Sequence, residues 1–110
     1  MKKFVIAAFL AVLLLSAAYA HSPSSISIKI LDGVVEVFVT HPVSDPATHY
    51  IKLIAVSLNG TEVGRQEFTT QKPDGQAASF TVPGLKSKDV VSVYAVCSRF
   101  GDKRKDLTVE

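Results

Sequence analysis

The stretch "ISIKILDGVVEVFVT", residues 26–40, carries the pattern that decides the fold of this chain. Ile26, Ile28 and Ile30 alternate with more polar residues, which is the period-2 pattern of a strand with one buried face. Asp32-Gly33 then supplies a two-residue turn, and a β-branched run follows it. The stretch therefore predicts an antiparallel hairpin.

Short apolar runs separated by turn residues continue to the C-terminus, without helical periodicity. Residues 50–58 are apolar on both faces, and Asn59-Gly60 predicts a second hairpin that returns over 61–68. Further strands are predicted over 77–82, 89–97 and 106–110, whereas the charged residues 103–105 indicate a solvated turn. These segments predict an all-β fold, a seven-stranded immunoglobulin-like β-sandwich, with a small barrel as the alternative. The alternation places these residues in the core: Ile26, Ile28, Ile30, Val37, Ile54, Phe80, Val93 and Leu107.

The beginning of the chain has the features of a cleavable signal peptide. Lys2 and Lys3 precede an apolar run, and Ala18-Tyr19-Ala20 offers small residues at the positions that a signal peptidase reads. We expect a signal peptide over 1–20, cleavage after Ala20, and one domain over 21–110 located in the periplasm or secreted, with no retained membrane anchor.

The charge balance of that domain excludes some partners. Removal of the leader leaves ten basic and ten acidic residues, so the apparent basicity belongs to the export signal. No basic stripe interleaved with aromatic residues is present. We therefore expect neither a nucleic-acid nor an anionic-membrane partner.

Few side chains in the predicted domain are suited to bind a metal. They are His21, His41, His49 and Cys97. Imidazole and thiolate groups bind iron, zinc and copper. Plain structural roles remain open at this point: a strand-end histidine, a surface histidine and a small buried cysteine. A lone cysteine in an exported protein also suggests a disulfide-linked homodimer.

Three short motifs carry most of these residues in order. They are His41-Pro42, His49-Tyr50-Ile51 and the run Cys97-Ser98-Arg99-Phe100-Gly101. This order resembles the iron-binding domain of desulfoferrodoxin and neelaredoxin, the superoxide reductase family, in which the last motif is Cys-x-x-His-Gly. The resemblance implies an immunoglobulin-like domain that binds mononuclear non-haem iron.

The same resemblance implies roles for the ligand candidates. His21, His41 and His49 correspond to equatorial iron ligands, and Cys97 corresponds to the axial thiolate. The implied activity is the one-electron reduction of superoxide to peroxide, an oxidoreductase reaction with superoxide and a small electron-transfer protein as partners. The thiolate pushes electron density onto the iron, and an open coordination position admits the substrate.

Two positions depart from the family pattern. The last histidine is replaced by Phe100, which cannot bind a metal, and the family's lysine falls at Ala20, which leaves with the leader. Lys52 or Lys103 are candidate replacements for that lysine. Cleavage after Ala20 would also give His21 a free α-amino nitrogen, a fourth nitrogen donor that favours copper. The alternative function is a non-catalytic module that binds iron, copper or zinc, or an interaction module, on the same fold.

Overall fold

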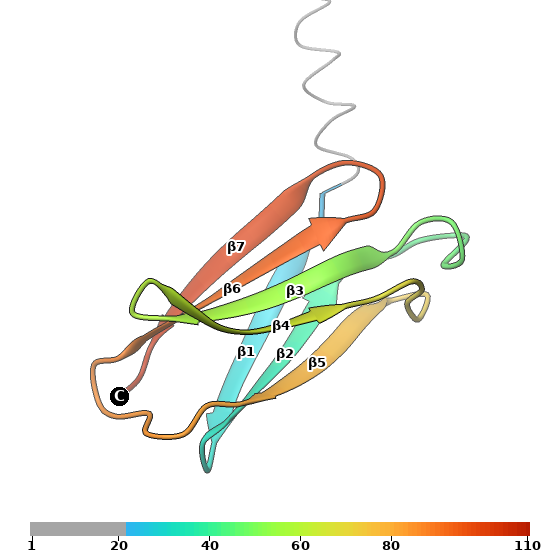
Figure 1. Cartoon of the computed structure of the whole chain (residues 1–110). Helices are drawn as coiled ribbons and strands as arrows, with labels where there is room; N and C mark the ends of the chain where they lie inside the picture. The colour runs from blue at the N-terminus through green and yellow to red at the C-terminus, as the bar shows by residue number, and fades with distance from the viewer. Residues whose placement is uncertain (1–21) are drawn as a thin grey trace, which may run out of the picture.

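A computed structural model describes residues 22–110 and contains seven strands (Figure 1). They are β1 (Ser25–Leu31), β2 (Val34–Thr40), β3 (Ile51–Leu58), β4 (Thr61–Glu67), β5 (Gly75–Thr81), β6 (Val90–Cys97) and β7 (Asp102–Thr108). Within this described part of the chain there is no helix long and apolar enough to cross a membrane. The predicted signal peptide, residues 1–20, and His21 lie outside the described residues.

The strands form two antiparallel sheets, with strand orders β1-β2-β5 and β4-β3-β6-β7. Asp32-Gly33 joins β1 to β2, and Asn59-Gly60 joins β3 to β4. All four of these residues have positive φ, at 52°, 74°, 50° and 89° in chain order. Two successive positive φ angles are characteristic of the type I′ turn, whose twist matches that of paired strands. Both predicted hairpins are confirmed.

The apolar side chains of both sheets share one core, which lies between the two layers seen in Figure 1. Several residues predicted to be in the core are buried there: Ile26, Val37, Ile54, Phe80 and Val93. Ile28 and Ile30 are partly buried against the core, because β1 is an edge strand. Leu107 is half-buried on the other sheet's edge strand and lies outside the core cluster, so that prediction was wrong.

The strand β7 corrects the prediction for the C-terminal segment. It begins at Asp102, so residues 103–105 belong to a strand and not to a solvated turn. Arg104 pairs with Tyr94 and Lys105 with Val93 of β6, the only neighbour of β7 in its sheet. Charged side chains are common on edge strands because they discourage further pairing. Seven strands in two antiparallel sheets are confirmed, and the immunoglobulin-like assignment stays a prediction.

The register of the four-stranded sheet defines two ends of the molecule. Ile51 at the start of β3 pairs with Cys97 at the end of β6, and Leu58 at the other end of β3 pairs with Val91. In the second sheet, Thr40 at the end of β2 pairs with Gly75 at the start of β5. We call the end that holds Ile51 and Cys97 the histidine end, because His41 and His49 lie there.

Candidate metal centre

Three segments deliver the ligand candidates to the histidine end. His41 directly follows β2, His49 lies two residues before β3, and Cys97 is the last residue of β6. The pairing of Ile51 with Cys97 brings the His49 segment beside the cysteine. The cluster therefore joins residues from both sheets.

The side chains of this cluster converge. His49 Nε2 lies 3.2 Å from Cys97 Sγ, and the centroids of the two imidazole rings lie 4.8 Å apart with the planes at 85°. One candidate ligand atom from each of the three residues lies within 4.8 Å of the others. Metal bonds of about 2.0–2.3 Å require donor atoms about 3–4.5 Å apart. The predicted convergence of His41, His49 and Cys97 is confirmed, and these donors fit one metal ion.

Burial separates these residues from ordinary surface groups. The exposed fractions of His41 and Cys97 are 3% and 2%, and His49 is half-buried. The free thiol of Cys97 thus faces an imidazole inside the protein and is not presented to another chain. A disulfide with a second copy, one of the predicted alternatives, would require this end to open.

Backbone and side-chain hydrogen bonds tie the His49 segment to the Cys97 segment. Ser98 N–H donates to Tyr50 O at 2.8 Å, and Tyr50 N–H donates to Ser98 Oγ at 3.1 Å. The Arg99 guanidinium donates to Thr48 O and Thr48 Oγ1, both at 3.3 Å. The Arg99 peptide N–H also points at Cys97 Sγ, at 3.5 Å. These hydrogen bonds hold the two ligand segments side by side.

The N-terminal arm, residues 22–24, lies against the same cysteine loop. Gly101 has φ of 97°, and a Cβ atom there would overlap Ser22. Gly101 O accepts a hydrogen bond from Cys97 N–H at 3.0 Å, and Ser24 N–H donates to Thr40 O at 2.8 Å. Glycine is needed at position 101 because the backbone there is left-handed and because Ser22 approaches too closely for a Cβ atom. The arm therefore runs from the cysteine loop to the end of β2, directly after the undescribed His21.

Among the described residues, Phe100, which replaces the last histidine of the family pattern, and the two candidate lysines have no contact with the cluster that would identify a role. Phe100 is 55% exposed. Lys52 is exposed and lies on β3 at an irregularity of the pairing with β6, between Ile51 and Leu53. Lys103 lies on β7 opposite Ala95. A role for either lysine in attracting an anion stays a prediction.

Gln71 is a further residue of this site, and the sequence analysis missed it. Its side chain is buried, and its Oε1 atom lies 3.0 Å from Nδ1 of His41. Gln71 lies between β4 and β5, in a polar segment that resembles any exposed loop. No local pattern signals its burial, because its partners Ile51 and His41 are 20 and 30 residues away in the chain. Arg99, by contrast, lies inside the cysteine motif.

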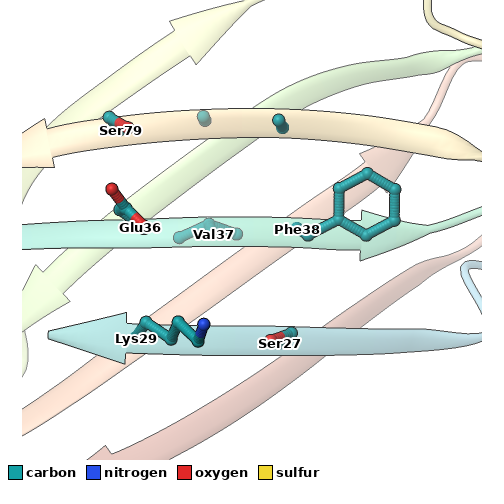
Figure 2. A pocket seen from close by; sticks show the side chains of 8 residues that line it. Ser27, Lys29, Glu36, Val37, Phe38 and Ser79 are labelled. Atoms are coloured by element: carbon teal, nitrogen blue, oxygen red, sulfur yellow. The ribbon is translucent and has the colours of Figure 1, made fainter.

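A second feature, a shallow hollow of about 330 Å³, lies on the outer face of the three-stranded sheet (Figure 2). Ser27, Lys29, Glu36 and Phe38 are among its lining residues, and Lys29 pairs with Glu36 across β1 and β2. It contains neither histidine nor cysteine. Metal-binding chemistry in the described residues is thus concentrated at the histidine end.

The fold and the cluster define an all-β protein with a candidate mononuclear histidine and cysteine centre. No protein-family model and no curated protein matches the chain. Solved structures of superoxide reductases do match it. The superoxide reductase (1Fe-SOR) from Giardia intestinalis has a TM-score of 0.61 at 24% identity, with 81% of this chain and 97% of that chain covered. The neelaredoxin from Archaeoglobus fulgidus in the reduced form has a TM-score of 0.54 at 24% identity, covering 83% and 90%.

These likenesses show that the chain has the superoxide reductase fold. The resemblance inferred from the three sequence motifs is therefore confirmed at the level of the fold. Identity this low establishes no activity by itself, so the function is argued from the site.

Proposed function

We propose that this protein is a mononuclear iron-binding redox protein that reduces superoxide to peroxide. One observation carries the proposal: His49 Nε2 and Cys97 Sγ lie 3.2 Å apart, with His41 in the same cluster, on the fold of solved superoxide reductases. A thiolate and imidazoles are the ligand types that suit a redox-active iron site.

The described residues have distinct parts in this proposal. Ferrous iron, when bound, would supply the one electron that converts superoxide into peroxide, and a small electron donor would restore it. Cys97 provides the sulfur ligand, and the Arg99 N–H stabilises its charge. Because His49 is only half-buried, this side of the cluster is open to solvent, from which two protons per superoxide complete hydrogen peroxide.

We further propose His21 as the fourth ligand residue. The support is the position of its neighbour: Ser22 lies against Gly101 in the cysteine loop, and Ser24 is bonded to Thr40, one residue before His41. Export and cleavage after Ala20, which the sequence predicts, would add the α-amino nitrogen of His21 as a fourth nitrogen donor beside the three imidazoles. Mass spectrometry of the mature protein from fractionated cells tests the cleavage site and the location together.

The alternative function is a non-catalytic metal-binding module. The observation that favours it is Phe100, which replaces a ligand of the family and is 55% exposed. A site with fewer imidazoles binds zinc well, because zinc prefers four ligands.

Metal analysis combined with a kinetic assay separates the two functions. The protein with its mature N-terminus is purified without oxygen, its metals are quantified, and superoxide decay is followed with peroxide and oxygen yields. We expect one iron per chain, a thiolate-to-ferric absorption band after oxidation, and peroxide formed without oxygen. Tightly bound zinc and no effect on superoxide would contradict the proposal and support the module. An Arg65→Ala variant is a matched control, because within residues 22–110 the Arg65 side chain bonds to the exposed Glu62 and to no ligand candidate.

A further inference from the structure

The side-chain amide of Gln71 is enclosed by four polar groups. Its Oε1 accepts from Ile51 N–H at 2.8 Å and lies 3.0 Å from His41 Nδ1. Its Nε2 donates to His41 O at 2.6 Å and to Lys72 O at 2.9 Å. The amide thus has two hydrogens facing carbonyl oxygens and one oxygen facing two nitrogens.

The backbone partners determine which way this amide points. If the amide were rotated by half a turn, its NH₂ group would face the Ile51 N–H, and its oxygen would face the His41 and Lys72 carbonyls. Donor would then oppose donor and acceptor would oppose acceptor. Unsatisfied polar groups are costly when buried, and Gln71 is only 7% exposed. Gln71 Oε1 is therefore the atom that faces the His41 ring.

A neutral imidazole carries its hydrogen on one of two nitrogens, and the other nitrogen has the lone pair that binds a metal. Because the amide oxygen can only accept, His41 Nδ1 must be the donor. We propose that Gln71 is a positioning residue that fixes the Nδ1–H tautomer of His41 and leaves Nε2 as its metal-binding atom. This inference rests on the proposed metal site for its purpose, although the tautomer itself does not require a metal.

The same amide also holds two ligand segments in place. It binds the carbonyl of His41 at the end of β2 and the N–H of Ile51, two residues after His49, at the start of β3. A single side chain therefore sets both the tautomer of one histidine and the approach of the segment that carries the other. Groups that orient metal-binding histidines in this way typically change metal affinity by about 10–100-fold when they are removed.

Nitrogen NMR of the histidine rings tests the tautomer directly. Metal-free protein labelled with ¹⁵N in histidine is measured above the pH at which the rings become neutral. We expect a protonated Nδ1 and an unprotonated Nε2 for His41 in the unmodified protein. A protonated Nε2 there would overturn the proposal without any variant.

Substitutions then test the role of Gln71. Gln71→Met preserves the size of the side chain without the amide, and we expect a mixture of His41 tautomers with an approximately 10–100-fold loss of zinc affinity by competition. Gln71→Glu keeps the acceptor oxygen but turns its second oxygen toward the His41 and Lys72 carbonyls, so we expect a less stable protein that retains the Nδ1–H signature. Gln66→Met is the control, since Gln66 donates to Ser79 O on the sheets away from the cluster.

An unchanged His41 tautomer in a folded Gln71→Met variant would contradict the proposal. A failure of the proposed function is distinguishable, because it would appear as absent iron or absent superoxide consumption while the NMR result for metal-free protein stayed the same. If Gln71→Met does not fold, the spectrum of the unmodified protein and the Gln71→Glu variant still decide the question.

Discussion

The histidine end and the opposite end of the two sheets contrast in how they use buried polar groups. The same two strands, β3 and β6, run from one end to the other. At the histidine end, Gln71 satisfies the backbone around His41. At the opposite end, Asn59 and the buried Asp89 satisfy the turns around them.

At the opposite end, the polar groups form hydrogen bonds with one another and with the turns around them. Asp89 accepts from Asn59 Nδ2 at 3.1 Å and from Lys86 N–H at 3.0 Å, while Asn59 Oδ1 accepts from Val90 N–H at 2.8 Å. The hydrogen bond from Asn59, followed by that from the Lys86 backbone, lowers the pKa of Asp89 despite its burial. This network locks two turns together and has no histidine or cysteine in it.

This difference between the two ends indicates which of them carries the candidate functional site. Every buried side-chain nitrogen and oxygen in the described residues has a hydrogen-bond partner, so unsatisfied groups do not mark the site. What distinguishes the histidine end is that two imidazoles and a thiol face one another after the backbone has been satisfied. Such a set of donors suits a metal ion, as proposed above, whereas the Asp89 network is explained by the turns alone.

The largest effect is expected from a glycine substitution at the histidine end, Gly75→Ala. Gly60→Ala at the opposite end serves for comparison. At Gly75, a Cβ atom would overlap the carbonyl group of Val39 and come within 3.1 Å of His41 N. We expect Gly75→Ala to lower the free energy of unfolding by about 3 kcal/mol and to weaken metal binding, because His41 must shift. At Gly60 a Cβ would meet nothing within 4 Å, so Gly60→Ala should cost only the strain of its positive φ, about 1 kcal/mol.

Urea unfolding measures the stability of both glycine variants, and metal competition measures their metal affinity. Equal losses of metal affinity at the two positions would break the contrast between the ends, because Gly60 lies in the turn that follows Leu58, away from the ligand candidates.

A smaller effect is expected when Asp89 becomes asparagine. The pKa of Asp89 is lowered in the folded state, so the ionised group contributes stability above its ordinary pKa of about 3.9 and loses that contribution as the pH falls through the folded-state value. Asp89→Asn should therefore lower the urea midpoint at pH 7, and the two proteins should converge in acid. Metal affinity should remain unchanged. A midpoint difference that does not depend on pH would show that the Asp89 charge has no part in the network.

The smallest effect is expected at Phe100. More than half of this side chain is exposed, and we propose that His21 supplies the fourth nitrogen, so Phe100→His should change iron affinity and superoxide rate by less than about threefold. The change is made in protein with the mature His21 terminus, with Phe38→His on the outer sheet face as control. A large gain in both quantities would show instead that the site lacks one imidazole.

The sequence predicted those parts of the molecule that depend on local pattern. The hairpins at Asp32-Gly33 and Asn59-Gly60 follow from turn chemistry, and the three ligand candidates follow from motifs in chain order. The start of β7 was missed because an exposed edge strand needs no apolar alternation, so residues 103–105 looked like a turn. Gln71 was missed because its burial results from backbone groups of two distant segments, those of His41 and Ile51, which no local spacing records.

The most direct test of the metal centre is X-ray absorption at the iron edge of the iron-loaded protein. The account predicts one sulfur neighbour at about 2.3 Å and several nitrogen neighbours at about 2.0–2.2 Å, by analogy with zinc bonds to the same ligand types. The sulfur neighbour should disappear in Cys97→Ser and persist in Arg65→Ala. Iron surrounded by oxygen and nitrogen alone, with a spectrum that Cys97→Ser does not change, would contradict the assignment of His41, His49 and Cys97 as its ligands.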